Sequence, residues 1–240
     1  DPKKAIAYSE ELLTQAEEQD SLQYMFSALL NKGHAYRSIG NFSQALEFHY
    51  KAAGIAAKLN SNRDVGKANV AIADDYSMAA NSKNAILYYK KAIIQFENLR
   101  DSLNLGVALS NLGDAYLKIK KPDSSLVYLV RSGEIFNALK YELGMGHNYA
   151  NMGLAHAQNG YPLAAEQNLN KAIKIFQDYG DYNAICICLN AMSAIFEEIG
   201  DHKKSLYFAH RSLGLAKNYG LKQEVSDASL VLSRLYEKNG

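Results

Sequence analysis

The stretch LLNKGHAYRSIGNFSQAL, residues 29–46, decides the fold because it recurs along the chain. It returns as LSNLGDAYLKIKKPDSSL at positions 109–126 and as YANMGLAHAQNGYPLAAE at positions 149–166. Each copy keeps a small residue, a ring three residues later, and a second small residue nine beyond the ring. A fixed spacing of this kind is the signature of a repeat protein, in which each repeat is one supersecondary unit.

A shift that places Gly33 on Ala73 aligns the whole chain with itself in six periods. The first small column reads Gly33, Ala73, Gly113, Gly153, Ser193 and Ser233, and the ring column reads Tyr36, Tyr76, Tyr116, His156, Phe196 and Tyr236. A second ring column reads Tyr8, Phe48, Tyr88, Tyr128, Asn168 and Phe208. Turn signals such as GN at 40–41 and GYP at 160–162 separate the two ring columns.

Each period contains two amphipathic segments of about 17 to 19 residues, in which apolar residues recur three and four positions apart. This spacing predicts two helices joined by a short turn, and therefore an all-α fold of stacked antiparallel hairpins with about 11–12 helices. Small residues would let the two backbones of a hairpin approach closely, and we expect the rings to fill the space between successive hairpins. Residues 1–240 are predicted to form a single domain of six periods.

This pattern resembles the tetratricopeptide repeat, whose signature combines a small residue, an aromatic residue, a turn glycine and two alanines on the second helix. The alanines correspond here to Ala45 and Ala52. The period that separates Gly113 from Gly153 is longer than the usual value of about 34. Such long repeats look like those of Pins-type polarity adaptors, kinesin light chains and bacterial Rap-type regulators. The resemblance implies a right-handed α-α superhelix, a solenoid, whose first helices line a concave groove that binds protein or peptide.

The two ends of the chain fall at equivalent points of the repeat, because 240 residues make six periods of 40. The chain therefore opens on a second helix. Repeat arrays normally need a polar capping element at each end, and neither end shows one, so we expect the native polypeptide to continue beyond this fragment. We also expect apolar end surfaces, through which two copies could pair as a homodimer, around Ile6, Leu13, Val231 and Leu235.

Composition argues against several classes of function. The 26 basic and 25 acidic residues give a net charge of +1, so no extended field would attract nucleic acid. The apolar run AAGIAA at 52–57 is far too short to span a bilayer, and no signal peptide opens the sequence. We expect a cytoplasmic protein without membrane insertion; the extracytoplasmic face of a membrane-anchored sensor stays open as an alternative.

The sequence contains no recognisable catalytic or metal motif. Its six histidines include no pair four residues apart, and Cys186 and Cys188 do not have zinc spacing. Adjacent carboxylates such as Asp74 and Asp75 are expected to look away from each other on a helix. We therefore expect no metal, no cofactor and no enzymatic activity in this part of the chain.

Candidate ligand-binding residues lie on the first helices, which line the concave face in the fold that the repeats resemble. Asn recurs two residues before the small column, and its amide offers both a donor and an acceptor to the backbone of an extended peptide. The resemblance to Pins-type and kinesin-light-chain arrays implies this role; the alternative is that these Asn residues bridge neighbouring helices. Asp74 and Asp114 either select a basic group of the ligand or are solvated. The full candidate peptide-binding set is Asn31, His34, Arg37, Asp74, Ser110, Asn111, Asp114, His147, Asn151, Gln158 and Asn190.

A ladder of basic residues recurs on the second helices, which lie on the convex side in the fold that the repeats resemble. Its members are Lys51, Lys91, Arg131, Lys171 and Arg211. We expect this ladder to be a solvated face.

Three functions remain open at this point, and the third is purely structural: assembly of a complex through the convex face or the open ends. The first is a non-catalytic scaffold that holds a partner peptide in the concave groove and contacts its backbone through Asn31, Asn111 and Asn151. The second is an N-terminal sensory or regulatory domain of a bacterial signalling enzyme, either a histidine kinase or an adenylate or guanylate cyclase.

Overall fold

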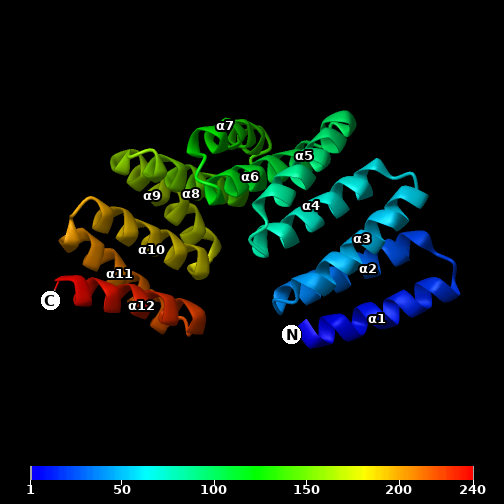
Figure 1. Cartoon of the computed structure of the whole chain (residues 1–240), viewed down its shortest axis with the longest axis horizontal. Coiled ribbons are helices and arrows are strands. Elements are labelled where there is room, and N and C mark those ends of the chain that lie inside the picture. Colours follow the sequence, from blue (N-terminus) through cyan, green and yellow to red (C-terminus); the bar gives the residue numbers. More distant parts are fainter. Residues whose placement is uncertain (1, 240) are drawn as a thin grey trace. The chain divides into compact units, whose positions relative to one another are not determined.

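The computed structural model describes residues 2–239; Asp1 and Gly240, the two ends of the predicted domain, lie outside this range. The described residues form twelve α-helices and no β-strand (Figure 1). The helices are α1 Pro2–Glu18, α2 Leu22–Ser38, α3 Phe42–Lys58, α4 Asn62–Met78, α5 Ser82–Leu99, α6 Ser102–Lys118, α7 Pro122–Ala138, α8 Glu142–Gln158, α9 Pro162–Tyr179, α10 Tyr182–Glu198, α11 His202–Asn218 and α12 Lys222–Asn239. The predicted all-α fold and its number of helices are confirmed.

The chain divides into two compact units, unit 1 (Asp1–Ile119) with helices α1 to α6 and unit 2 (Lys120–Gly240) with helices α7 to α12. Within each unit every helix packs against the next one along the chain. The single-domain organisation of the whole chain stays a prediction.

Each unit curves because its two sets of helices are unequally spaced. The first helices of successive hairpins contact one another, α2 with α4 and α4 with α6 in unit 1, and α8 with α10 and α10 with α12 in unit 2. Among the described residues, the second helices within a unit have no such contacts with one another. The side of each unit that is lined by first helices is therefore its concave side.

The turns recur twice in every period and share one backbone conformation. Residues 20, 40, 60 and so on to 220 all have positive φ, with Gly at five of these positions and six other residues, including Ala80 (φ 58°), at the rest. In the first complete hairpin the N–H of Gly40 donates to the Arg37 carbonyl at 2.9 Å, and the N–H of Asn41 donates to the Tyr36 carbonyl at 3.0 Å. This left-handed residue closes the end of each helix.

The residue after each left-handed position often begins the next helix. Side-chain oxygens accept a hydrogen bond from a backbone N–H in the first turn of the helix at Asn41, Ser61, Asn81, Asp101, Asp181 and Asp201. Such caps satisfy donors that a helix start otherwise leaves unpaired. Each turn predicted from the sequence thus combines the end of one helix with the N-cap of the next.

The small columns bring helices into close contact. Ala45, Ala85 and Ala165 are completely buried. A Cβ atom added at Gly33 would lie 2.3 Å from Nε2 of His49, and one added at Gly153 would lie 2.8 Å from Cγ of Leu169. Glycine at these two positions therefore makes room for a large side chain of the second helix, because neither contact leaves space for a methyl group.

The two ring columns stack on each other inside a hairpin. The rings of Tyr36 and Phe48 lie 5.3 Å apart, and the equivalent rings Tyr76 and Tyr88 lie 5.8 Å apart; the pair Phe196 and Phe208 is also stacked, at 5.6 Å. The two partners of each pair flank the same turn. Tyr76 and Tyr88 also contact Tyr50 of the preceding hairpin, whose hydroxyl lies 3.0 Å and 2.9 Å from theirs, so these two rings lie between successive hairpins as predicted.

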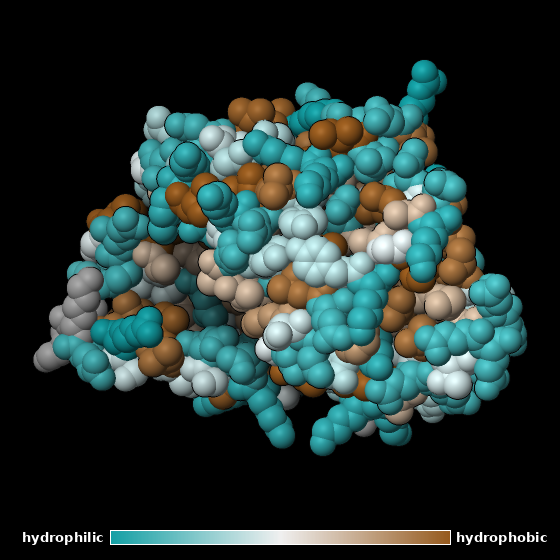
Figure 2. Space-filling view, turned by 45° about the vertical axis from the view of Figure 1, so that its right-hand side comes forward, coloured by the Kyte–Doolittle hydropathy of each residue, from teal (hydrophilic) through white to brown (hydrophobic). Residues whose placement is uncertain are grey.

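The surface is mixed in character. On the face shown in Figure 2, hydrophobic residues are scattered among hydrophilic ones. In the part of the chain that the structure describes, every helix falls short of the combined length and apolarity that crossing a bilayer demands.

The predicted apolar end surface on α12 differs from the observed one. Leu235 is buried and Val231 is half-buried, and both belong to a cluster that packs on α11. The large apolar side chains that α12 exposes are Leu230 and Tyr236. Pairing of two copies through the ends of the array stays a prediction.

Candidate functional site

A cluster of polar side chains on the concave side of unit 1 is centred on Arg37 of α2. Its Nη1 lies 3.3 Å from Oδ2 of Asp74, 3.3 Å from Oδ1 of Asp75 and 3.3 Å from the carbonyl oxygen of Ala71, all on α4. Its Nη2 donates to Nδ1 of His34 at 2.9 Å. One guanidinium group thus ties the first helices of two successive hairpins together.

The inner part of this cluster is a buried pair, Asp75 and His49, whose side chains are both 0% exposed. Nδ1 of His49 contacts Oδ2 of Asp75, and Nε2 lies 3.2 Å from the carbonyl oxygen of Leu30. Both ring nitrogens face acceptors, an arrangement that a protonated imidazole satisfies by donating twice. A buried carboxylate without such partners would be strongly destabilising, so His49 and Arg37 are the groups that permit Asp75 in the core.

Asp74 forms the outer part of the cluster and links three helices. Its Oδ1 accepts hydrogen bonds from the hydroxyl of Tyr89 on α5 at 2.6 Å and from Nδ2 of Asn111 on α6 at 3.3 Å. Burial raises the pKa of the Asp74 carboxyl, while the Tyr89 hydrogen bond and the charge of Arg37 oppose this shift. With three donors around it, this carboxylate has its partners within the chain.

Asp114 is also paired inside the chain. Its Oδ2 lies 2.9 Å from Nζ of Lys118, which in turn donates to Oγ of Ser77 at 2.6 Å. Both acidic candidates thus have basic partners of their own, which argues against the idea that they select a basic group of a ligand.

His34 presents a donor to the concave side. Because Arg37 can only donate, Nδ1 of His34 must accept, and the ring proton therefore sits on Nε2. Burial lowers the pKa of His34 to about 4, and the charges of Arg37 and His49 act in the same direction. At neutral pH the ring is uncharged and offers an N–H for which the described residues supply no acceptor.

Pockets open at the same register on the concave side of both units. The pocket of unit 1, about 370 Å³, is lined by Leu30, His34, Arg37, Lys67, Val70, Ala71, Asp74, Phe96, Asn104 and Val107. That of unit 2, also about 370 Å³, has Leu154, Ala157, Ala191 and Ala194 at the positions of His34, Arg37, Ala71 and Asp74. At these four positions the groove carries three polar side chains in unit 1 and none in unit 2, although Lys120, Gln158 and Glu198 also line the pocket of unit 2.

The structure brings four of the eleven predicted site residues into one cluster: His34, Arg37, Asp74 and Asn111. Asn31 is exposed on α2, Ser110 is buried in α6, and Asp114 pairs with Lys118. In unit 2, Gln158 lines the pocket, Asn151 is half-buried, the ring of His147 lies 4.9 Å from that of Phe176, and the buried Oδ1 of Asn190 has no hydrogen-bond partner among the described residues. These four residues of unit 2 form no common cluster.

Three members of the cluster were absent from the predicted set: His49, Asp75 and Tyr89. A comparison of columns could have found the first two. The column of His49 otherwise holds Ser9, Tyr89, Leu129, Leu169 and Ala209, and that of Asp75 otherwise holds Ala35, Ala115, Ala155, Ile195 and Leu235. The expectation that Asp74 and Asp75 look away from each other is also wrong in effect, because both reach the same long guanidinium group.

The basic ladder of the second helices packs on aromatic rings. Lys91 Nζ lies 4.4 Å from the ring centre of Tyr88, and Lys51 Nζ lies 5.2 Å from that of Phe48. In the period where Asn168 interrupts the ring column, Lys171 lies 5.2 Å from the ring of Tyr149 instead. Cations over aromatic faces are favourable even at exposed sites, so part of this ladder covers the ring columns.

No group of three or more His, Cys, Asp or Glu side chains suited to a metal ion occurs within residues 2–239. Both cysteines are buried free thiols, and burial raises the pKa of Cys188 to about 12. Neither cysteine therefore has the exposed, ionisable character of a reactive thiol.

Comparison with known proteins identifies the repeats. The family model described as "Tetratricopeptide repeat" matches residues 26–59 and 146–179, which begin in α2 and α8 and end with α3 and α9. The chain contains tetratricopeptide repeats. No curated protein sequence matches the chain significantly.

Solved structures share the fold of these tetratricopeptide repeats at low identity. BtubC (BKLC) from P. vanneervenii is 16% identical, with 91% of this chain and 92% of that chain covered and a TM-score of 0.75. The Rap conjugation gene regulator of the plasmid pLS20, in complex with the Phr* peptide, is 16% identical, with 94% and 62% covered and a TM-score of 0.75. A kinesin-light-chain protein of P. anserina with nearly identical TPR-like repeats is 12% identical, with 82% and 96% covered and a TM-score of 0.63. The fold is that of a helical solenoid.

Proposed function

We propose that this chain is a non-catalytic scaffold that binds a peptide segment of a partner protein on the concave side of its first helices. The observation that carries the proposal is the pair of concave pockets at matching register in the two units. A groove that recurs along an array suits an extended chain, whose side chains also recur at a fixed spacing. The Rap regulator solved with the Phr* peptide supports a peptide as the ligand.

In unit 1 the groove offers hydrogen-bond donors beside an apolar surface. The N–H on Nε2 of His34 and the amide of exposed Asn31 are placed to bind carbonyl oxygens of a peptide backbone, which are acceptors only. Leu30, Val70 and Val107 line the same pocket and would cover an apolar side chain. Because Asp74 is already surrounded by donors, we propose that this pocket prefers acceptors over ammonium groups.

In unit 2 the groove is suited to an apolar side chain. Its lining combines Leu154, Ala191 and Ala194 with the charged side chains of Lys120 and Glu198, and the small alanines leave room for an aliphatic side chain. Burial of one aliphatic side chain here would contribute about 1.5–3 kcal/mol.

The test is selection of peptides from a displayed random library by the full chain. Ala194→Lys fills the unit 2 pocket, and Asn170→Lys adds the same residue at an exposed position on α9 as the matched control. We expect wild type and Asn170→Lys to enrich the same peptides, and Ala194→Lys to lose them. The proposal is wrong if wild type enriches nothing, or if Ala194→Lys binds the selected peptides as tightly as the control.

A second variant tests the backbone contacts. The double variant Asn31→Ala and Asn151→Ala removes two amides for which the described structure shows no internal hydrogen bond. Its stability should therefore stay the same, and weaker binding would report on the lost contacts with the peptide. We expect the selected peptides to bind about 30-fold more weakly, at about 1 kcal/mol for each of the two lost hydrogen bonds. The alternative of a regulatory domain of a bacterial kinase or cyclase has no structural observation in its favour, and we do not propose it.

A further inference from the structure

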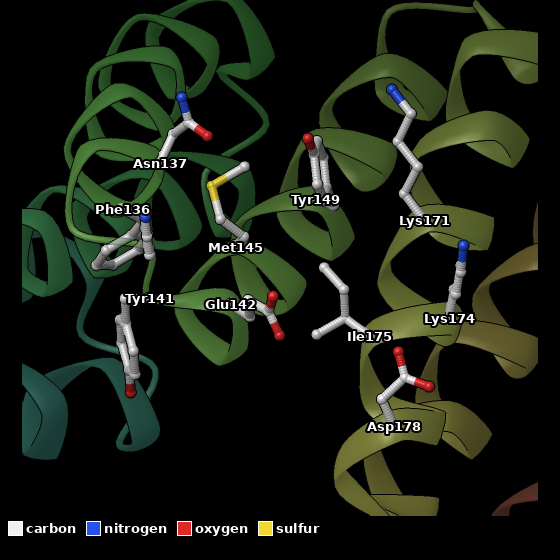
Figure 3. Close-up of a pocket in the computed structure, with 11 residues that line it drawn as sticks. Phe136, Asn137, Tyr141, Glu142, Met145, Tyr149, Lys171, Lys174, Ile175 and Asp178 are labelled. Atoms are coloured by element: carbon white, nitrogen blue, oxygen red, sulfur yellow. The ribbon is translucent and has the colours of Figure 1, made fainter.

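A second pocket, of about 560 Å³, opens on the outer side of unit 2 (Figure 3). The end of α7, the start of α8 and the end of α9 line it. Its volume falls in the range of about 300–1,000 Å³ that is typical of sites for small molecules. The residues that α8 contributes, Glu142, Met145 and Tyr149, are not those that face the concave groove, so the two pockets are separate.

Figure 3 shows that the polar groups of this pocket are sorted by kind. Lys171 and Lys174 extend from α9 along one side, and the Tyr149 hydroxyl and the Asn137 amide point toward the same end. The carboxylate of Glu142 lies below Met145 and beside Ile175, and that of Asp178 lies lower still, below Lys174. Hydrogen-bond donors thus cluster at one end of the pocket, next to its apolar side chains.

The lysines of this pocket lack acidic partners. In the described part of the chain, Lys140, Lys171 and Lys174 form no ion pair, and Lys171 contacts the Tyr149 ring. In four other periods the column of Tyr149 holds the buried residues Leu29, Asn69, Leu109 and Leu189, and in the last period it holds the exposed Ser229. Tyr149 is half-buried and lines the pocket. Its hydroxyl has no hydrogen-bond partner among the described residues.

We propose that this outer pocket binds a small organic anion that carries one negative group on an aromatic or aliphatic body. The body would lie on Met145 and Ile175, and the anionic group would meet the ammonium groups of Lys171 and Lys174 and the hydroxyl of Tyr149. The carboxylates of Glu142 and Asp178 would repel a second negative charge at the far end. The ligand is therefore a monoanion, and its binding weakens as salt screens the lysines.

The chain contains its own control for this proposal. The equivalent groove of unit 1, about 420 Å³ between α1, α2 and α3, keeps Met25, Lys51 and Ile55 at the positions of Met145, Lys171 and Ile175. It has Leu29, Gly54 and Glu17 at the positions of Tyr149, Lys174 and Asn137. At the end where the anionic group would lie, three donors are thus lost and a carboxylate is gained, while Lys58 replaces Asp178 at the other end. This groove should therefore not hold an anionic group beside Lys51.

The experiment is a fluorescence titration of the full chain with 1-anilinonaphthalene-8-sulfonate, an aromatic monoanion. The double variant Tyr149→Leu and Lys174→Gly gives the outer pocket two residues that unit 1 already carries, and should bind the probe about fivefold more weakly or worse, as expected for loss of a favourable charge contact. Lys174→Gln, a change at an exposed position, is the second variant should the first fail to fold by circular dichroism. Unchanged probe affinity in the folded variants would overturn the proposal.

Competition experiments distinguish a site that selects anions from one that binds any apolar molecule. Octanoate should displace the probe, whereas octylammonium, with the same chain and the opposite charge, should not. Equal displacement by both would overturn the proposal. In the reverse direction, Glu17→Asn and Gly54→Lys, both at exposed positions of unit 1, should add a second binding site for the probe; a Cβ at Gly54 meets no atom within 4 Å, so the substitution is sterically free.

Discussion

The buried pair of His49 and Asp75 should show strong energetic coupling. The corresponding pair two periods later is Leu129 and Ala155, and both of these residues are fully buried as well. The double variant His49→Leu and Asp75→Ala therefore replaces the ionic pair with an apolar pair that this fold already accommodates. The two single variants each remove one partner and leave the other in the core.

The contacts set the expected magnitudes. Asp75→Ala leaves the His49 ring facing a void on one side, and His49→Leu leaves a fully buried carboxylate with Arg37 as its remaining charged partner. Removing one member of a buried pair typically costs about 3–5 kcal/mol, whereas replacing both with apolar residues is often neutral or stabilising. We expect each single variant to lose about 3 kcal/mol, the double variant to stay within about 1–2 kcal/mol of wild type, and the coupling energy to exceed about 3 kcal/mol.

The assay is urea unfolding followed by far-UV circular dichroism, together with hydrogen exchange of peptides from α3 and α4. Exchange data are needed because the chain has two compact units, and a single unfolding free energy is defined only for a two-state transition. Destabilisation should appear in α2 to α5 and leave unit 2 unchanged. Strictly additive effects in the double variant, or singles within about 1 kcal/mol of wild type, would refute the reasoning.

Two further predictions concern the turns and the titration of the cluster. Ala80→Gly should stabilise the chain by up to about 1 kcal/mol, because Ala80 has a φ of 58° that strains any residue with a Cβ. Gly200→Ala (φ 81°) should destabilise it by about 1–2 kcal/mol for the same reason. Urea unfolding of both variants checks these values, and a loss of stability in Ala80→Gly would contradict the reasoning. Lowering the pH from 7 toward about 5 should destabilise unit 1, because the folded pKa of His34 is about 4 against an ordinary value of 6.5, so the unfolded state binds the proton first. Asp74, whose pKa is raised, acts in the opposite sense, since its folded form takes up a proton more readily as the pH falls. His34→Phe, in which Arg37, His49 and Asp74 still surround the ring, should show a smaller loss of melting temperature over this range than wild type, and an identical loss would remove His34 as the cause.

The repeat and its turns could be predicted from the sequence because both are local. A left-handed residue and a capping side chain follow each helix within two positions, as at Gly40 and Asn41, so the signals stand together in the chain. The spacing of small residues also fixes which face of each helix is buried. The candidate concave columns follow the same register, and some of their residues line a pocket in each unit; their use by a ligand stays a prediction.

The polar cluster and the outer pocket could not be read in the same way. The cluster depends on departures from the repeat, a histidine and an aspartate in columns that are mostly apolar, whose side chains meet across 26 residues. Arg37 appeared as a ligand contact from its position alone, but its length lets it turn toward Asp75. The outer pocket needs side chains from three helices at once, and the lysine ladder on its own indicated only a solvated face.

The backbone conformation repeats every 20 residues, at the left-handed positions, whereas the side-chain columns repeat every 40 residues. A deletion of residues 41–80 would join Gly40 to Asn81, another capping asparagine, and keep every remaining column in phase. A deletion of half that length would also join two equivalent turns, yet it would put a first-helix face where a second-helix face belongs. The gene can therefore lengthen or shorten this array only in whole hairpins, and each such step adds or removes one stretch of groove.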